Sequence, residues 1–482
     1  MHGPSHRIVL AALAAVALGA AAAAAKTKPA TLPVAPLSSA GRWLVDATGR
    51  VVVPHGMNDV EKAAPYYPAA AGLGEDDAIF LAAEGFGTLR LGVDFRGLMP
   101  APGMVDDAYV EHLAATVDAF GRHGIFVLLD FHQDGFSPMF NGNGFPDWMA
   151  ISDGLPNPPD AVFPLYYVQN PAMQRAFEHF WANDPGPNGI GLQDYFVQGL
   201  AAVVGRFAGN PMVLGYELLN EPWPGATWAP CVAAGTGCPD LETALLRPFG
   251  AKMTAVVRAL TTQQLVFVEP FVLFNFGQAP TSLPGQGSGN GLAFHSYALD
   301  AAGEVGVVQW AADAAERDGA PILETEFGAT TDAATLTRLT SQADARLVPW
   351  MFWAYNENVV ADPGAPAGPD NLRSEAAFAA LVRPHPVAVA GTPTALAFDA
   401  DTRALDFTYV PERPGGGRSA RRLLTTLWLP KRQYPQGYTV QARGAIVTSK
   451  PCAEALTLRT RARAREVTVH VTPGGRGAKR CG

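Results

Sequence analysis

Hydrophobic and polar positions follow a regular order along residues 41–383: a short apolar run, a polar turn and an amphipathic helical pattern, repeated eight times. The apolar runs are rich in Val, Leu, Ile and Phe, which is typical of parallel strands buried on both faces. They are Val51–Met57, Thr88–Val93, Ile125–Phe131, Val213–Leu219, Leu265–Val268, Leu292–Phe294, Ile322–Glu326 and Val348–Ala354. Eight such units predict an α/β fold, a (β/α)8 barrel (TIM barrel).

The clearest helical patterns lie between these runs, at Asp106–His123, Leu192–Phe207, Leu241–Leu260, Glu304–Asp318 and Asp332–Ala345. A doubly wound parallel sheet is the alternative fold. That fold would carry a glycine-rich dinucleotide-binding turn after its first strand, and the sequence has none there. The pattern therefore favours the barrel.

After Arg383 the helical period stops, and short alternating runs separated by Gly and Pro replace it. The runs are Leu396–Phe398, Leu405–Tyr409, Leu423–Leu427, Tyr438–Gln441, Leu456–Arg459 and Val467–Val471. They predict a small antiparallel β-sandwich over residues 384–482. We expect the boundary to fall in a linker at Pro384–Pro393.

The N-terminus has the pattern of a targeting segment. One Arg precedes an apolar stretch, Ile8–Ala20, and the alanine run that follows offers small-residue cleavage sites. We expect residues 1–25 to be a signal peptide, residues 26–40 a flexible leader, and the mature protein to be secreted. An uncleaved membrane anchor is the alternative, but the alanine-rich segment is weakly hydrophobic for that role.

The chain has 482 residues, too many for one hydrophobic core, and a formal charge of −9, which argues against nucleic acid as a partner. The charge is uneven: residues 384–482 hold 16 Lys and Arg against six Asp and Glu, while residues 26–383 hold 18 against 38. The basic domain could dock on the acidic barrel, or it could contact an anionic lipid surface. The basic residues that suggest such contact are Arg418, Arg421, Arg422, Lys431 and Arg432, with Arg459, Arg461, Arg463 and Arg465 alternating along a second predicted strand.

Four cysteines fit an oxidising compartment and allow three pairings. The simplest of the three joins the cysteines that are nearest in sequence, Cys231 with Cys238 and Cys452 with Cys481. A zinc site is not expected, because the sequence has no CxxC pair and no cluster of His near these cysteines.

Reactive side chains gather at the predicted carboxyl ends of the strands, where the active site of a barrel enzyme lies. They are Arg90, His132, Asp134, Asn220, Glu221, His295, Tyr297, Glu326 and Trp353. Two carboxylates facing each other across a barrel mouth suit cleavage of a glycosidic bond, which needs an acid for the leaving oxygen and a carboxylate for the anomeric carbon.

The tripeptides Asn220-Glu221-Pro222 and Glu326-Phe327-Gly328 resemble those of family 5 of the retaining glycoside hydrolases. Longer segments are similar to the endoglycoceramidases: LLDFHQDGFS (128–137), NGNGFPDWM (141–149), DGLP (153–156), PLYYVQNPAMQRAFEHFW (164–181) and AVAGTPT (388–394). The resemblance runs from about Gly41 to Thr472. The sequence differs from the family pattern after the eighth predicted strand, at AYNENVVADPG (354–364), and around Phe271.

The resemblance implies a role for each matching residue. Glu221 would be the general acid/base and Glu326 the nucleophile. Asn220 would bind the sugar 2-hydroxyl, Tyr297 would hydrogen-bond near the nucleophile, and Trp353 would lie under the cleaved sugar. Lys62, His132 and Asp134 would hold sugar hydroxyls, Arg90 would steer Glu326, and His295 joins the substrate-binding set. No metal or other cofactor is implied.

Two further carboxylates lie on the same strands, and one of them, Glu324, is the alternative candidate for the nucleophile. Glu324 lies two residues before Glu326, so strand alternation predicts that it shares the same face at a deeper level. Glu217 lies deeper than Glu221, and we expect it to be a buried partner of Arg90.

The leading hypothesis is an endo-acting β-glycosidase that cuts glycosphingolipids between oligosaccharide and ceramide. A family-5 β-glycosidase acting on a steryl glucoside or a β-glucan is the first alternative, and a non-catalytic sugar- or lipid-binding protein is the second. We expect a glycolipid substrate and a monomeric enzyme. The aromatic residues Phe136, Phe140, Phe145, Trp148, Phe163, Tyr166 and Tyr167 either pack the loop after strand three or line a slot for lipid.

Overall fold

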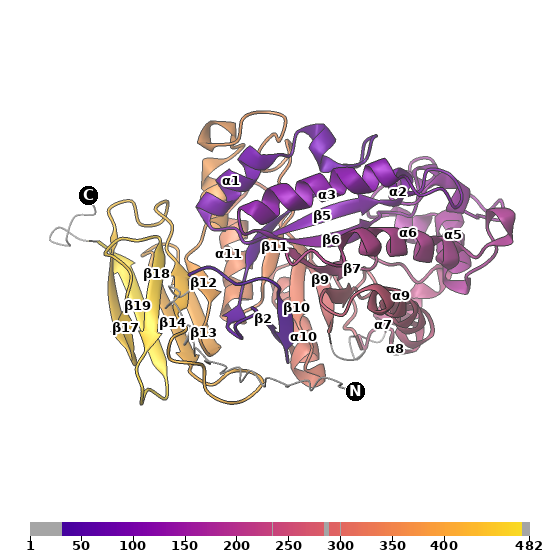
Figure 1. The fold of residues 1–482 in the computed structure, drawn as a ribbon. Helices are drawn as coiled ribbons and strands as arrows, with labels where there is room; N and C mark the ends of the chain where they lie inside the picture. Colours follow the sequence, from indigo (N-terminus) through magenta and orange to yellow (C-terminus); the bar gives the residue numbers. More distant parts are fainter. Residues whose placement is uncertain (1–30, 234, 284–288, 299, 475–482) are drawn as a thin grey trace, which may run out of the picture.

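The computed structural model describes residues 31–233, 235–283, 289–298 and 300–474. Eight parallel strands close into a barrel in the order β4-β5-β6-β7-β8-β9-β10-β11 (Figure 1). They are β4 (His55–Asp59), β5 (Thr88–Asp94), β6 (Phe126–His132), β7 (Val213–Glu217), β8 (Leu265–Val268), β9 (Asn290–Ser296), β10 (Ile322–Phe327) and β11 (Trp350–Phe352). Each lies within or overlaps one of the eight predicted runs, so the predicted barrel is confirmed.

Helices cover the outside of the barrel. They are α1 (Glu75–Glu84), α2 (Phe95–Leu98), α3 (Asp107–Arg122), α4 (Tyr166–Gln169), α5 (Pro171–Ala182), α6 (Leu192–Phe207), α7 (Ala229–Ala233), α8 (Pro239–Leu241), α9 (Arg247–Leu260), α10 (Ala301–Asp318), α11 (Ala333–Ala345) and α12 (Glu375–Leu381). Several begin at a capping side chain, as when Asp106 accepts hydrogen bonds from the first amides of α3 and Asp332 from that of Thr335 in α11.

One strand–helix unit differs from the prediction of eight. The connection from β8 to β9 forms only turns, with no α-helix in its described residues, 269–283 and 289. The sequence there, PFVLFNFGQAP, is apolar without a helical period, and Phe271, Val272 and Phe274 are buried. This segment therefore covers the barrel by direct packing.

On β6 and β8 the side chains that point into the barrel change from apolar to polar toward the carboxyl end of the strand. On β6, Phe126 and Leu128 belong to an apolar cluster inside the barrel, and Asp130 and His132 follow at two-residue steps on the same face. Leu265 and Phe267 of β8 belong to the same cluster, and Glu269 follows them. Apolar packing thus fills the lower barrel, and polar groups occupy its carboxyl end.

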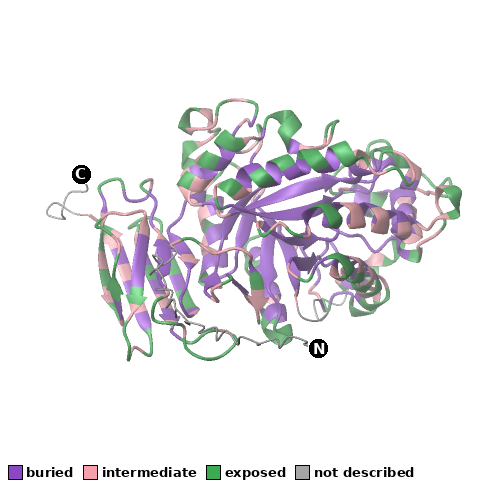
Figure 2. Ribbon diagram, viewed as in Figure 1, coloured by how far each residue is buried: buried purple, intermediate pink, exposed green. Residues whose placement is uncertain are grey.

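Two four-stranded antiparallel sheets follow the barrel, in the orders β12-β15-β18-β17 and β13-β14-β19-β16. Their strands are β12 (His385–Ala388), β13 (Thr392–Asp399), β14 (Ala404–Val410), β15 (Thr425–Trp428), β16 (Tyr438–Arg443), β17 (Ala445–Val447), β18 (Ala455–Thr460) and β19 (Val467–Pro473). Burial alternates along β14, β16 and β19 of the second sheet (Figure 2). The predicted sandwich is confirmed, but the predicted linker is not a linker, because most of it is folded into β12 and the start of β13.

The sandwich and the barrel share a core. Val51, Val53 and Leu347 of the barrel region pack in one cluster with Val389 and Leu396. The remaining short strands, β1 (Ser38–Ala40), β2 (Trp43–Val45) and β3 (Val51–Val52), form a sheet at this junction. The prediction of a flexible leader is therefore wrong for its described part, residues 31–40, where Leu37 is buried and β1 pairs with β2.

Part of the basic set on the sandwich contacts the acidic barrel. Arg432 forms ion pairs with Glu84 at the end of α1, at 2.5 Å, and with Glu375 of α12. Arg461, Arg463 and Arg465 were expected to alternate along a strand, but they lie in the turn between β18 and β19. For Arg432, these contacts favour docking of the sandwich on the barrel over contact with lipid.

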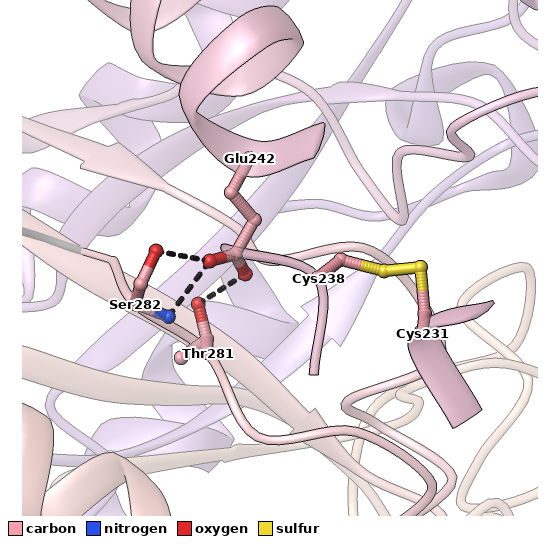
Figure 3. The surroundings of a disulfide bond; sticks show 5 residues. All are labelled: Cys231, Cys238, Glu242, Thr281 and Ser282. Atoms are coloured by element: carbon pink, nitrogen blue, oxygen red, sulfur yellow. Dashed lines mark hydrogen bonds between the residues drawn. A yellow bond between two sulfur atoms is a disulfide. The ribbon is translucent and has the colours of Figure 1, made fainter. Parts of the chain in front are cut away.

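Cys231 and Cys238 form the expected disulfide at the edge of the barrel (Figure 3). Close to it, Glu242 accepts hydrogen bonds from Thr281 Oγ1 at 2.6 Å and from the Ser282 amide at 2.7 Å. The disulfide loop is thereby tied to the segment after β8. Cys481 lies outside the described residues, so its pairing with Cys452 stays a prediction.

Residues 1–30 also lie outside the described part, and the predicted signal peptide falls among them. Within the described residues, no helix has both the length and the apolar character needed to cross a membrane.

Candidate active site

A cavity of about 390 Å³ opens at the carboxyl end of the barrel. Its lining includes Lys62, Asp134, Asn141, Asn143, Phe163, Tyr166, Glu221, Phe276, Tyr297, Glu326, Ala329 and Trp353. The loops around α5, which follow β6, lie at one end of the molecule and the sandwich lies at the other (Figure 1). The cavity therefore faces away from the C-terminal domain.

Arg90 on β5 is the central cation of the site and has no exposed surface. Its Nε and Nη2 donate to the two carboxylate oxygens of Glu217, at 2.7 and 3.2 Å. Nη1 donates to Glu326 Oε1 at 2.5 Å, and Nη2 to Asn220 Oδ1 at 2.7 Å. One guanidinium thus fixes side chains from β7, from the turn after β7 and from β10, and Glu217 is the buried Arg90 partner that the sequence predicts.

Glu326 receives two further contacts. Tyr297 Oη donates to Glu326 Oε2 at 3.0 Å, and His295 Nδ1 lies 3.6 Å from the same oxygen. Burial raises the pKa of Glu326, while His295 and Arg90 oppose that rise. Hydrogen bonds donated by Arg90 and Tyr297 favour the ionised form, which is the form that a nucleophile requires.

Glu221 lies in the turn after β7, four residues beyond the end of the strand, in a left-handed backbone conformation with a φ of 42°. Its Oε1 lies 2.8 Å from His295 Nδ1 and accepts a hydrogen bond from Asn275 Nδ2 at 3.2 Å. Burial, with the nearby charge of Asp134, raises its pKa to about 7. A carboxyl group with such a pKa is half protonated near neutral pH and can act as an acid.

The two carboxylates are close enough for a retaining mechanism. One oxygen of Glu221, one of Glu326 and a ring nitrogen of His295 all lie within 4.8 Å of one another. Retaining glycosidases hold their carboxyl groups about 5–5.5 Å apart, whereas inverting enzymes need about 6.5–9.5 Å to admit a water.

A second cluster forms the polar wall of the cavity. Asp134 Oδ2 accepts a hydrogen bond from Lys62 Nζ at 2.5 Å and lies 3.3 Å from His132 Nε2. The His132 ring stacks on Trp353, and Lys62 Nζ lies 4.8 Å from the centre of the same indole. Burial lowers the pKa of His132, but Asp130 and Asp134 outweigh it and raise that pKa to about 9. The structure therefore brings the sequence-predicted substrate-binding residues together.

Glu324 does not share the inward face of Glu326, contrary to the prediction from strand alternation. The register of β10 against β9 shifts between Glu324 and Glu326. Thr325 points inward and donates to Glu217 Oε1 at 3.0 Å, whereas the charges that act on Glu324 belong to Asp344 on α11 and Glu304 on α10. The irregularity turns Glu326 into the cavity and leaves Glu324 facing the helices.

Most of the aromatic residues in the loop after β6 pack the loop itself. The buried ones are Phe136, Phe140, Phe145, Tyr166 and Tyr167, and Trp148 is partly buried against the core. Phe163 is 50% exposed and lines the cavity together with Tyr166. Of these seven aromatic residues only Phe163 and Tyr166 line the cavity, so they do not form a broad slot, and Phe276 from the segment after β8 adds a third aromatic ring to the lining.

Sequence reasoning missed several polar residues that hold the site. Gln133 Nε2 donates to the carbonyl oxygens of Asn220 and Glu221, at 2.7 and 3.0 Å. Asn275 contacts Glu221, and Glu269 Oε2 accepts a hydrogen bond from the Glu221 amide at 3.2 Å. The position of Glu269 directly after a strand was the one signal available for it.

Carboxylates and His295 form two compact groups in the described part of the chain, Glu217–Glu269–His295 and Glu221–His295–Glu326. Arg90 lies within 3.6 Å of Glu217, Glu269 and Glu326, so a guanidinium already supplies the positive charge that these carboxylates need. The arrangement suits acid–base chemistry carried by side chains.

A (β/α)8 barrel with two closely spaced carboxylates at the carboxyl end of its strands defines the class as a glycoside hydrolase. Residues 45–359 match the model of cellulase (glycosyl hydrolase family 5), and residues 383–472 match the glycoside hydrolase family 5 C-terminal domain. The chain belongs to glycoside hydrolase family 5 and is a retaining glycoside hydrolase.

Among curated proteins, endoglycoceramidase I of Rhodococcus hoagii (strain 103S) is 36% identical over 478 residues, which cover 94% of this chain and 91% of that protein. Among solved structures, the five-membered iminocyclitol complex of endo-glycoceramidase II from Rhodococcus sp. has a TM-score of 0.72 and 27% identity, covering 93% of this chain and all of that one. The lactosyl-enzyme intermediate of the same enzyme has a TM-score of 0.70 and 27% identity, with 89% and 99% coverage. The family resemblance read from the sequence is confirmed.

Proposed function

We propose that this protein is an endo-acting retaining β-glycosidase that hydrolyses the bond between the oligosaccharide and the ceramide of glycosphingolipids. The observation that carries the proposal is the pairing of Glu221 and Glu326, with oxygens within 4.8 Å, in a cavity lined by both charged and aromatic side chains. A substrate with a sugar joined to an apolar aglycone matches this mixed lining. The near full-length similarity to endoglycoceramidase I supports the same substrate class.

In the first step, a Glu326 carboxylate oxygen attacks the anomeric carbon, and the bond from that carbon to the ceramide oxygen breaks. Glu221 gives its proton to the departing oxygen, which releases ceramide as a neutral alcohol. In the second step, Glu221 takes a proton from water, and the water oxygen displaces Glu326 from the anomeric carbon. The anomeric configuration is retained because the carbon is inverted twice.

Other residues of the site would position the sugar. Asn220, which is buried and held by Arg90, would bind the 2-hydroxyl, and Tyr297, which donates a hydrogen bond to Glu326, would orient that carboxylate. Lys62, His132 and Asp134 present charged donors and acceptors for hydroxyls next to the Trp353 ring. An apolar ring face beside hydrogen-bonding groups suits a pyranose, which has both kinds of surface.

The aromatic side chains of the cavity lining are the basis for proposing an apolar aglycone. Phe163, Tyr166 and Phe276 lie on the lining of the same cavity as the two carboxylates. A complex of endo-glycoceramidase II with ganglioside GM3 has a TM-score of 0.69 and 26% identity to this chain, over 90% of this chain and 99% of that one. This likeness supports a glycosphingolipid as the substrate.

A comparison of matched substrates tests the proposal. Purified enzyme is given a glycosylceramide, a steryl glucoside and a β-glucan oligosaccharide at equal concentration in detergent. We expect kcat/KM to be highest for the glycosylceramide by at least about tenfold. A higher value for the steryl glucoside or the glucan would contradict the ceramide assignment.

We also propose that the protein is exported, because the first 25 residues have the pattern of a signal peptide and Cys231 and Cys238 form a disulfide.

Contact with a lipid surface is proposed at the cavity mouth and not at the basic sandwich. Exposed apolar side chains gather in the loop after β6, at Met139, Leu155, Val162, Phe163, Leu165 and Val168. Phe163 joins this group to the cavity. Residues 138–170 contain three Asp and no Lys or Arg, so apolar insertion, and not attraction to anionic lipid, is the expected mode.

A further inference from the structure

Glu269 is a buried carboxyl group that the proposed mechanism does not use. It follows β8 directly and is 3% exposed. Its Oε2 accepts a hydrogen bond from the Glu221 amide at 3.2 Å, and its Oε1 lies 3.5 Å from His295 Nε2. His295 in turn contacts the Glu221 carboxylate through Nδ1. Glu269 therefore reaches Glu221 by two routes, through the backbone and through the imidazole.

A carboxyl oxygen of Glu269 lies within 4.8 Å of one of Glu217, and both groups are buried. Two buried carboxyl groups at this distance repel each other when both are ionised, whereas a proton on one of them can be donated to the other. Glu217 already accepts from Arg90 twice and from Thr325 at 3.0 Å, which stabilises its charged form. The proton of the pair therefore belongs on Glu269, where burial and the charge of Glu217 raise the pKa.

The charges around Arg90 lead to the same protonation state. Its guanidinium is within 3.1 Å of carboxylate oxygens of Asp130, Glu217 and Glu326. Glu269 lies 3.6 Å away, so its ionisation would place a fourth negative charge beside a single positive one. The titratable or charged groups that face Glu269 are Arg90, Glu217, Glu221 and His295. The apolar residues Leu218, Pro222, Leu246, Phe249 and Val268 share a small cavity with it.

We propose that Glu269 acts in its uncharged form as a positioning residue for Glu221. Its acceptor oxygen holds the Glu221 amide in the left-handed conformation, which is costly for a residue other than glycine. Its proton satisfies Glu217, so Arg90 stays directed at Glu326. The inference rests on the proposed role of Glu221 as the acid.

A pair of substitutions separates this role from a general structural one. In Glu269→Gln the amide oxygen still accepts from the Glu221 amide and the amide nitrogen still donates to Glu217, so the uncharged form is reproduced. In Glu269→Met both hydrogen bonds are lost. Each variant is assayed with an aryl β-glycoside that has a poor leaving group and with one that has an activated leaving group, across the pH range.

We expect Glu269→Gln to keep kcat/KM within about threefold of wild type for both aryl glycosides, with an unchanged pH profile. We expect Glu269→Met to lose at least about tenfold more activity on the poor leaving group than on the activated one, because only the poor one depends on protonation by Glu221. Glu324→Met is the matched control, since Glu324 is equally buried but faces the helices. It should lower both rates by the same factor.

A loss of activity in Glu269→Gln as large as that in Glu269→Met would overturn the proposal, because it would mean that the charge of Glu269 is needed. Equal losses on the two leaving groups in Glu269→Met would also overturn it. Aryl glycosides keep this test separate from the ceramide assignment, which is read from the glycolipid comparison on the wild-type enzyme.

Discussion

Arg90 Nη1 donates a hydrogen bond to Glu326 Oε1 at 2.5 Å. The other two nitrogens of the same guanidinium, Nε and Nη2, donate to Glu217. A cation on β5 thus sets the position of a carboxylate on β10. The planar fork of Arg allows this, because it presents several donors in fixed directions, whereas Lys presents one ammonium.

Replacing Arg90 should affect both stability and activity. In Arg90→Met three carboxylates would be left buried without their cation, so we expect a loss of about 3–5 kcal/mol in the free energy of unfolding. Urea unfolding measures it. Arg383→Met is the control. Arg383 is also buried, and its Nε lies 2.8 Å from Asp344 Oδ2, but this pair does not line the cavity. We expect Arg383→Met to lose stability but keep kcat. We expect Arg90→Lys to stay folded but lose kcat.

The two carboxylates should respond differently to substitution. Glu326→Gln should abolish turnover of every substrate, because no group remains to form the glycosyl-enzyme bond. Glu221→Gln should lose about 10²–10⁴-fold in kcat/KM on a poor leaving group and little on an activated one, which needs no proton. Steady-state kinetics with the two aryl glycosides measures this. An inactive Glu324→Gln beside a fully active Glu326→Gln would contradict the assignment.

The pH dependence follows from the same pair. Glu221 must be protonated to act as the acid, and its pKa is about 7, so kcat/KM on a poor leaving group should fall about tenfold per pH unit above that value. Glu326 must be ionised, and its raised pKa places the low-pH fall above the range of an exposed Glu. An activated leaving group should not show the high-pH fall. A high-pH fall that persists with the activated substrate, or in Glu221→Gln, would speak against Glu221.

Vesicle binding should depend on the loop after β6. We expect Phe163→Asp and Leu165→Asp to reduce sedimentation with neutral phosphatidylcholine vesicles, because they put charge on exposed apolar positions. The double variant Arg421→Glu, Arg422→Glu on the sandwich is the control and should bind as wild type does. Binding that needs anionic lipid, weakens steeply with salt and is lost in the Arg variant would instead favour the basic sandwich.

The sequence predicted the barrel well because buried parallel strands leave a strong signal, and all eight apolar runs correspond to strands. It placed the cavity residues at strand ends for the same reason. Glu324 shows the limit of that reasoning. A two-residue period assumes regular pairing, and the irregularity between Glu324 and Glu326 depends on how β10 pairs with β9, which is a tertiary property.

Other features were hidden because they depend on contacts between distant segments. Glu269 is one acidic residue among 44 in the sequence, and only the closed barrel places it against Glu217 and His295. The sequence left open whether Arg432 docks on the barrel or contacts lipid, and in the fold it pairs with Glu84 and Glu375 of the barrel. The Pro384–Pro393 segment looked like a linker because of its prolines, yet its strand β12 pairs antiparallel with β15.

The central claim is tested most directly by mass analysis of the products from one purified glycosphingolipid hydrolysed in ¹⁸O-labelled water. The account predicts intact oligosaccharide carrying a single ¹⁸O at its reducing end and intact ceramide carrying none, because the bond between the anomeric carbon and the ceramide oxygen is broken on the sugar side. The same reaction with Glu326→Gln should give neither product. Release of single sugars, of free fatty acid, or of ceramide carrying ¹⁸O would contradict it.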